Sequence, residues 1–191
     1  IRSRERAILS MGCDEYPEIE QKLQRGIDHP IPPKYVETTP NKQVIETGED
    51  VDLFRLPIPM SSVYDGGPMI TAGVTIARDP DYGINSGIYR FMVKEKNLTG
   101  IDIVTPNNMR LFAQRAYEAG RPCPISISIG THPFEIMGSG FRAPLGVDEI
   151  VLEAEILPTG WAHPEGRFGE FTRLMGGLHW NPLVRVKAIT R

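Results

Sequence analysis

The sequence predicts an α+β fold in which one or two helices cover a sheet. Runs of β-branched residues bounded by turn residues predict the strands, and the clearest is Met69–Arg78, which a turn at residues 79–83 follows. Helical spacing of apolar residues is confined to the start of the chain and to residues 105–119. The 19 glycines and 17 prolines make about 19% of the 191 residues, against about 12% in average proteins. This excess favours strands and loops over a helical bundle, and the order of elements is not a regular βαβ alternation.

The chain begins with two predicted helices. Residues 3–12 begin with a serine cap and end at a glycine, and residues 15–27 carry an isoleucine or leucine at every fourth position. Four prolines within residues 28–40 then predict a linker or an extended wrap. We therefore expect residues 1–40 to form an N-terminal helical segment with a proline-rich linker, and residues 41–191 to form the central domain.

The remaining elements follow the same signals. A helix is expected to begin at Thr105, with Pro106 in its first turn, and to run to Ala119, where Gly120 stops it. A short helix is expected after Pro133. Further strands are predicted at Gly87–Val93, Gly100–Val104, Pro124–Ile129, Ile150–Leu157 and Val184–Thr190.

Charge, cysteine content and hydropathy exclude several classes of protein. A net charge of −3 and a pI near 5.8 argue against a basic nucleic-acid binder. Two cysteines, Cys13 and Cys123, cannot build a disulfide framework, so we expect a reducing, cytoplasmic location. No apolar run reaches the roughly 18 residues of a membrane span, and no secretory signal is seen. Because the chain lacks an initiator methionine, we expect its natural start to lie upstream.

Two carboxylates stand close together in the segment Pro164–Glu170. Glu165 and Glu170 are five residues apart, with glycines at 166 and 169 between them. This spacing suits neither a helix face nor a strand, so it predicts a shaped loop that can aim both side chains at one point. Paired carboxylates in one pocket push their pKa values apart, which makes one of them a proton donor. The alternative is a solvated turn.

A second polar group lies in Asn85–Arg90. Asn85 offers a neutral oxygen that suits Mg²⁺ or Mn²⁺, and Arg90 offers a planar fork for a carboxylate or a phosphate. Their odd offset would place them on opposite faces of an unbroken strand, unless Gly87 holds a bulge. The alternative is a polar strand edge with a surface arginine. The four histidines and two cysteines lack the spacing of a zinc site.

Several motifs in order carry a resemblance that covers nearly all of residues 50–191. They read DGGPMITAGVTIARDPDYGINSGIYRFMV, LTGIDIVTPNN, PISISIGTHP, LGVDE, IVLEAE and EGRFGE. Together they resemble the UbiD family of prenylated-flavin-dependent (de)carboxylases. The resemblance implies that the central domain is a flavin-binding split β-barrel with covering helices, and that residues 1–49 are part of an N-terminal α/β segment.

The resemblance also implies an activity. Family members carry out reversible, non-oxidative decarboxylation of aromatic, heteroaromatic or α,β-unsaturated acids, and they release CO₂. Their cofactor is prenylated FMN, which a separate flavin prenyltransferase supplies. The ions expected with it are Mn²⁺ or Mg²⁺, with K⁺ as a further candidate. A homo-oligomer is expected.

Site residues follow from the same resemblance. Arg90, Glu165 and Glu170 match the Glu–Arg–Glu set beside the flavin, and Glu170 matches the proton donor. The expected metal ligands are Asn85, Asn108 and Glu149. The expected cofactor-binding residues are Asn85, Ser86, Gly87, Ile88, Tyr89, Arg90, Asn107 and Asn108.

The sequence departs from the family pattern in four places. The motif at 165–170 reads EGRFGE where EGPFGE is usual, and Asn108 stands where ferulate-type members have a metal-binding histidine. Glu149 is followed at once by Ile150, although several tens of residues separate these motifs in the family, so we expect an internal deletion or a disorder gap at 149/150. The family continues well beyond Arg191, with a lysine near the flavin, so we expect its C-terminal domain to be absent from this sequence.

Two other functions remain open from the sequence. One is a plain FMN-binding split-barrel reductase, which would oxidise NAD(P)H with unmodified FMN and needs no Glu–Arg–Glu set. The other is an inactive or incomplete family fragment that acts as a binding or structural protein.

Overall fold

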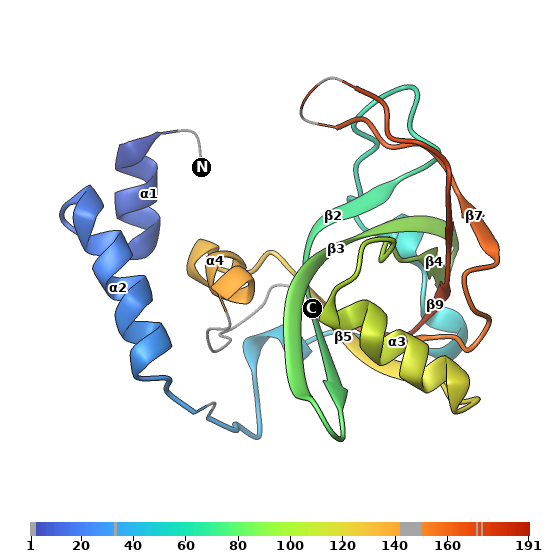
Figure 1. The fold of residues 1–191 in the computed structure, drawn as a ribbon, viewed down its shortest axis with the longest axis horizontal. Helices are drawn as coiled ribbons and strands as arrows, with labels where there is room; N and C mark the ends of the chain where they lie inside the picture. The colour runs from blue at the N-terminus through green and yellow to red at the C-terminus, as the bar shows by residue number, and fades with distance from the viewer. Residues whose placement is uncertain (1–2, 33, 142–149, 171, 173) are drawn as a thin grey trace.

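The computed structural model describes the chain except for residues 1–2, 33, 142–149, 171 and 173. Six antiparallel strands close into a barrel (Figure 1). Their order is β9-β4-β3-β2-β5-β6, and β6 pairs again with β9. The predicted α+β split barrel is therefore confirmed. The bounds of the barrel strands are β2 Met69–Asp79, β3 Gly83–Glu95, β4 Leu98–Gly100, β5 Cys123–Ile129, β6 Ile150–Ile156 and β9 Leu183–Thr190.

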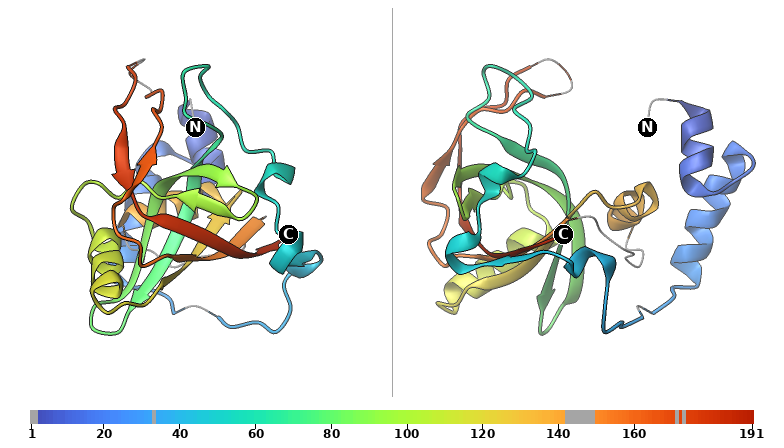
Figure 2. Two further views of the ribbon diagram at one scale, coloured as in Figure 1. Left: turned by 90° about the vertical axis from the view of Figure 1, so that its right-hand side faces the viewer. Right: turned by 180° about the vertical axis from the view of Figure 1, so that it is seen from behind.

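Three short strands lie outside the ring. β1 (Ile45–Thr47) pairs with the last residues of β9, while β4 pairs with the first residues of that strand. β7 (His163–Glu165) and β8 (His179–Asn181) form a separate two-stranded ribbon at one side of the barrel (Figures 1 and 2). None of these three was predicted, because a strand of three residues is too short to show an alternating pattern.

The helices lie at two sides of the barrel. α3 (Asn108–Glu118) packs on the barrel wall, whereas α1 (Arg4–Met11) and α2 (Tyr16–Asp28) form a pair at the far side of α4 (Pro133–Phe141), as Figures 1 and 2 show. Short 3₁₀ turns occupy η1 Pro40–Lys42, η2 Gly48–Asp50 and η3 Leu53–Arg55. Among the residues described, no helix has the length and apolar character that a membrane crossing requires.

The core fills the barrel with branched side chains. Ile127 of β5, Leu152 of β6 and Ile189 of β9 are fully buried, as is Phe91 of β3. α3 adds Met109, Phe112, Ala113 and Ala116, which are all buried. Burial of such side chains stabilises a fold by about 1.5–3 kcal/mol each, so these residues stabilise the closed barrel.

The helix caps agree with the sequence at the N-terminus but not at α3. Ser3 caps α1 by accepting a hydrogen bond from the Arg6 amide, and Gly12 ends the helix in the left-handed conformation, both as predicted. The predicted start of α3 at Thr105 is wrong. Asn107 is the N-cap and accepts from the Arg110 amide at 2.9 Å, because asparagine is a stronger cap than threonine.

Two strand predictions also need correction. The predicted strand Gly100–Val104 is wrong beyond its first residue, since β4 ends at Gly100 and the chain then leaves the sheet. The strand predicted at Gly87–Val93 extends over the whole of β3, because its hairpin with β2 continues to the turn at Gly83. The residue pair 149/150 lies partly outside the described residues, and the domain boundary at 40/41 stays a prediction.

Candidate active site

Arg90 is the centre of a cluster of carboxylates on the outer face of the barrel. Its Nη2 contacts Asp102 Oδ2, its Nε lies 3.7 Å from Glu165 Oε1, and its Nη1 lies 3.7 Å from Glu170 Oε1. The Phe168 ring covers the guanidinium, with its centroid 4.7 Å from the Cζ atom. The structure thus brings the three predicted residues Arg90, Glu165 and Glu170 together, and it adds Asp102.

The loop that follows Glu165 at the end of β7 and carries Glu170 is held by a second loop, residues 59–68. The Gly66 amide donates to the Arg167 carbonyl at 2.8 Å, and the Gly169 amide donates to Asp65 Oδ1 at 2.7 Å. Gly66 and Gly166 touch through their backbones, because a Cβ at Gly166 would lie 2.5 Å from the Gly66 Cα. The prediction that the whole segment 164–170 is a loop is wrong at its first two residues, because Pro164 and Glu165 belong to β7. Residues 166–170 form a shaped loop that these backbone contacts hold.

Glu165 is fully buried, although it carries a titratable group. Neither of its carboxylate oxygens has a hydrogen bond of ordinary geometry. Burial raises the pKa of Glu165, the neighbouring Asp102 charge raises it further, and the Asn181 amide, Arg90 and Lys94 oppose the rise only in part. A carboxyl group in these surroundings holds its proton to higher pH than an exposed glutamate does.

Lys94 lies beside Glu165 on the same strand as Arg90. Its Nζ donates to the Pro164 carbonyl at 2.7 Å, next to the buried carboxyl group. Burial lowers the pKa of Lys94, and the charge of Glu165 opposes this effect. The lysine therefore ties the ribbon of β7 and β8 to the barrel and adds positive charge to the cluster.

Asn85 faces away from this cluster. Its Nδ2 donates to the Tyr89 hydroxyl at 3.3 Å. The bulge suggested at Gly87 is absent, because Gly87 pairs with Thr75 in regular register. The irregularity lies instead on β2 between Ile70 and Gly73, opposite Arg90. Asn85 and Arg90 are therefore on opposite faces of β3.

Tyr89 closes the Asn85 side of the strand. Burial raises the pKa of Tyr89, while hydrogen bonds from Asn85 and the Met109 amide oppose the rise. A Cβ at Gly87 would lie 2.9 Å from the tyrosine ring, so the glycine makes room for that ring.

Ser86 and Ile88 alternate with these residues along β3 and lie on the same face as Arg90. Ser86 has a buried hydroxyl with no hydrogen-bond partner, and Ile88 is 44% exposed.

The expected metal ligands come from three separate segments of the chain. Within the described residues, no three histidine, cysteine, aspartate or glutamate side chains are placed to hold a metal ion. Glu149 lies outside those residues, and Asn108 is the first residue of α3. Asn107 uses its amide as the helix cap and also donates to the Thr105 carbonyl at 3.0 Å. The metal set Asn85, Asn108 and Glu149 stays a prediction.

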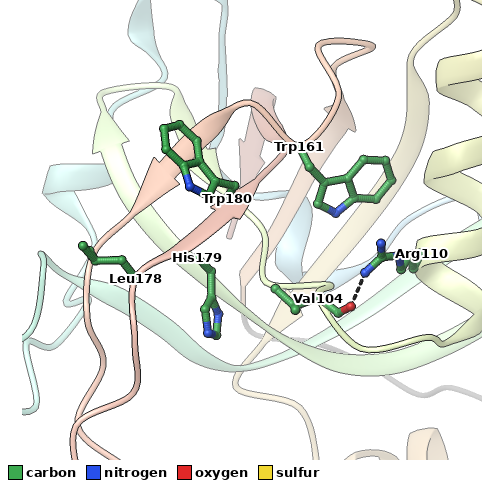
Figure 3. Close-up of a pocket in the computed structure, with 6 residues that line it drawn as sticks. All are labelled: Val104, Arg110, Trp161, Leu178, His179 and Trp180. Atoms are coloured by element: carbon green, nitrogen blue, oxygen red, sulfur yellow. Dashed lines mark hydrogen bonds between the residues drawn. The ribbon is translucent and has the colours of Figure 1, made fainter.

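An open pocket of about 330 Å³ adjoins the cluster. Figure 3 shows its lining residues, which are Val104, Arg110, Trp161, Leu178, His179 and Trp180. The Arg110 guanidinium lies 5.2 Å from the Trp161 ring centroid and donates to the Val104 carbonyl. His179 connects the pocket to the cluster, since its Nδ1 lies 3.6 Å from Asp102 Oδ2.

Sequence reasoning missed Asp102 and gave His179 no role. A signal for Asp102 was present, because it stands between Ile101 and Ile103, which are both fully buried. An aspartate between two core residues needs a charged or hydrogen-bonding partner. The sequence does not show which partner it finds, because Arg90 is twelve residues away on β3, whereas Asp102 lies beyond the end of β4.

Comparison with known proteins gives consistent relatives. The chain matches the family model of the 3-octaprenyl-4-hydroxybenzoate carboxy-lyase Rift-related domain, UbiD, over residues 34–150 and 148–191. It is 34% identical over 149 residues to the anhydromevalonate phosphate decarboxylase of Methanothermobacter thermautotrophicus, covering 78% of this chain and 34% of that protein. It is 32% identical over 196 residues to the phenolic acid decarboxylase of Bacillus subtilis, covering 84% of this chain and 41% of that protein.

Solved structures agree with these relatives. The evolved dimeric form of the UbiD-class enzyme HmfF from Pelotomaculum thermopropionicum, in complex with prFMN, has a TM-score of 0.86 and 32% identity, over all of this chain and 51% of that one. The apo 3,4-dihydroxybenzoic acid decarboxylase AroY of Klebsiella pneumoniae has a TM-score of 0.80 and 26% identity, over 98% of this chain and 48% of that one. The chain spans less than half the length of the curated relatives it matches. Because the family model covers most of its residues and the barrel agrees with solved members, the chain belongs to the UbiD family.

Proposed function

We propose that the protein to which this chain belongs is a carboxy-lyase that reversibly decarboxylates an aromatic, heteroaromatic or α,β-unsaturated acid with prenylated FMN. The observation that carries the proposal is the position of Arg90 between Glu165 and Glu170, at 3.7 Å from each carboxylate. Two relatives are named decarboxylases and one related structure is a prFMN complex, which supports this reaction class.

The reaction needs a cofactor, because loss of CO₂ leaves a carbanion and no side chain of this chain is an electron sink. Prenylated FMN, when bound, supplies that sink. The β3 segment from Asn85 to Arg90 fits a flavin: Ser86 has an unpartnered buried hydroxyl, and Ile88 is an exposed apolar residue on the same face as Arg90. We propose this segment, with Asn107 and Asn108 at the start of α3, as the cofactor-binding residues.

The metal site is a separate proposal. The Asn85 amide uses its nitrogen on Tyr89, which leaves its oxygen for a hard cation such as Mn²⁺ or Mg²⁺. Asn108 and Glu149 are proposed as the other ligands, and K⁺ as a further ion. A flavin prenyltransferase would supply the cofactor, and we propose a homo-oligomer, since one related structure is named a dimeric form.

The protein's own residues have three roles in the proposed reaction. The fork of Arg90 binds and orients the substrate carboxylate. Glu170, whose side chain is 42% exposed, returns a proton to the carbon that loses CO₂. Burial raises the pKa of Glu165, and its buried carboxyl group adjusts the electrostatic surroundings of Arg90 and Glu170.

A hydrogen–deuterium exchange assay tests the proposal. The full-length protein is co-expressed with a flavin prenyltransferase, and exchange into a panel of aromatic and unsaturated acids is measured. Glu170→Gln is expected to lower the exchange rate by about 10²–10⁴-fold, the usual contribution of a general acid, and to leave the flavin bound. Glu153→Gln, which changes an exposed residue of β6, is the matched control and should keep the wild-type rate.

Three results would contradict the proposal. Retention of the exchange rate in Glu170→Gln would remove the proton-donor role. Oxidation of NAD(P)H with unmodified FMN would indicate a flavin reductase. Failure of the wild-type protein to take up any flavin would favour a binding or structural protein.

A further inference from the structure

Asp102 is bound to Arg90 through both backbone and side chain. The Asp102 amide donates to the Arg90 carbonyl at 2.9 Å, and the Asp102 carboxylate makes the closest contact that the guanidinium has within the cluster. The Asp102 side chain is 19% exposed, so water screens this ion pair only in part. The backbone hydrogen bond therefore holds Asp102 beside the Arg90 guanidinium.

The far side of Asp102 faces an imidazole. His179 Nδ1 lies 3.6 Å from the same oxygen that Arg90 contacts, and this nitrogen is buried without a hydrogen-bond partner. His179 pairs with Glu165 across β7 and β8 and also lines the pocket of Figure 3. The Asp102 carboxylate therefore stands between Arg90 and His179.

The charges of the cluster do not balance. Three carboxylates, from Asp102, Glu165 and Glu170, surround one guanidinium, and Lys94 adds one further positive charge beside Glu165. A guanidinium forms its strongest contacts as a fork that serves one carboxylate at short range. Here Asp102 takes the short contact, whereas both glutamates are 3.7 Å away, beyond a normal hydrogen bond.

We propose that Asp102 is a positioning residue of this centre: it draws the Arg90 guanidinium toward itself, so that the buried Glu165 carboxyl group keeps its proton to higher pH than it would with Arg90 closer to it. The inference rests on the proposed function, because it explains how a proton is kept available for return to carbon. It adds a residue outside the Glu–Arg–Glu set, acting through Arg90.

Infrared titration of the full-length protein in D₂O tests this directly. The carbonyl stretch of a protonated carboxylic acid is followed against pH, and its loss in Glu165→Gln assigns the band. Asp102→Asn removes the charge and keeps the shape, so Arg90 is free to close on the glutamates. The band is expected to disappear about one pH unit lower than in wild type, a tenfold drop in proton affinity. The pH dependence of exchange should shift in the same direction.

The controls separate Asp102 from other effects. Asp81→Asn removes a carboxylate that pairs with Arg115 away from the cluster, and it should keep the wild-type midpoint. His179→Gln leaves Asp102 charged and should move the midpoint less than Asp102→Asn does. If Asp102→Asn does not fold, as judged by circular dichroism, Asp102→Ser carries the same test, since serine also removes the charge.

Two outcomes would overturn the inference. One is a band midpoint in Asp102→Asn that equals that of wild type and Asp81→Asn. The other is a larger shift of the midpoint in His179→Gln than in Asp102→Asn. That result would mean that the His179 imidazole, and not Asp102, determines the proton affinity of Glu165. A wild-type protein without any exchange activity would contradict the proposed decarboxylation, yet the infrared midpoints would still decide the role of Asp102.

Discussion

The Glu165 carboxylate lies directly against the backbone of Gly100. A Cβ added at Gly100 would fall 2.4 Å from Glu165 Oε2, a distance that real Cβ atoms do not tolerate. Gly100 ends β4 opposite Leu183, in ordinary strand pairing. Position 100 therefore needs a glycine because a side chain there would collide with Glu165. The backbone conformation of Gly100 is one that other residues also adopt. The buried carboxyl group occupies the space that such a side chain would need on the barrel wall.

Gly100→Ala is expected to push the Glu165 carboxyl group out of position. Overpacking of this kind costs about 1–3 kcal/mol, and the end of a glutamate side chain yields more easily than backbone does. We therefore expect a stability loss in the lower part of that range and a large loss of exchange activity. Chemical denaturation and the exchange assay measure the two effects.

The matched control is Gly177→Ala, because an added Cβ there meets nothing within 4 Å. It should change neither stability nor exchange. Wild-type exchange in Gly100→Ala would show that the position of Glu165 is not critical.

Glu165→Gln should change how stability depends on pH. Because the folded-state pKa of Glu165 lies above its ordinary value of 4.5, the folded protein binds the proton more tightly than the unfolded chain does. This contribution is fully present below the ordinary pKa and is lost as pH rises through the folded-state pKa. Glutamine cannot ionise, so the variant should gain stability relative to wild type as pH rises across that window, by about 1.4 kcal/mol for each unit of pKa elevation.

Thermal unfolding of both proteins from pH 4 to pH 9 measures this difference. Glu153→Gln, on the exposed side of β6, should follow wild type throughout. A constant difference between Glu165→Gln and wild type over the whole range would mean that Glu165 titrates as an exposed carboxyl group does.

The contact of Gly66 with Gly166 predicts a second steric effect. A Cβ at Gly66 would lie 2.4 Å from the Gly166 Cα, and backbone cannot move aside as a side chain can. Gly66→Ala should therefore separate the two loops, expose Glu165 and cost about 1–3 kcal/mol. Amide hydrogen exchange of Gly66 and Gly169, whose amides bond across the loops, reports the separation.

Gly67→Ala is the neighbouring control. Its added Cβ would meet the nearest atom at 3.6 Å, which is ordinary contact. Equal protection of the loop amides in both variants would contradict the proposed packing.

Local patterns predicted the barrel well. The β-branched runs of β2, β5, β6 and β9 and the apolar face of α3 are dictated by burial, which a sequence records residue by residue. The missed strands β7 and β8 have three residues each, and β7 contains Pro164. Their pairing depends on the loop contacts around them and leaves no periodic signal.

The site was predicted in part, for a related reason. The glycines between Glu165 and Glu170 indicated a shaped loop, and both carboxylates do lie near Arg90, one at the end of β7 and the other on the loop that follows it. The prediction of a possible bulge at Gly87 was wrong. A glycine inside a strand often marks a bulge, but here it makes room for the Tyr89 ring. Asp102 was missed because its ion pair joins a segment beyond the end of β4 to Arg90 of β3, and such pairing depends on the tertiary fold.

Asn85→Ala is expected to lower cofactor retention and to leave the proton step intact. Asn85 lies on the face of β3 opposite Arg90, so its loss leaves the Glu165 and Glu170 contacts in place. We expect a purified variant of the full-length protein to hold less flavin than wild type, while its exchange rate per bound flavin stays the same. Flavin absorbance per polypeptide measures retention, and elemental analysis measures bound manganese or magnesium.

Tyr89→Phe separates the two parts of this prediction. It removes the hydroxyl that orients the Asn85 amide at 3.3 Å but keeps the aromatic ring beside Gly87, so retention should fall less than in Asn85→Ala. Asn41→Ala, which removes an amide in the η1 turn, is the control and should hold the wild-type amount of flavin. An unchanged flavin content in Asn85→Ala would count against a cofactor or metal role for this residue. A fall in the exchange rate per bound flavin would instead mean that Asn85 affects proton transfer, although Asn85 and Arg90 lie on opposite faces of β3.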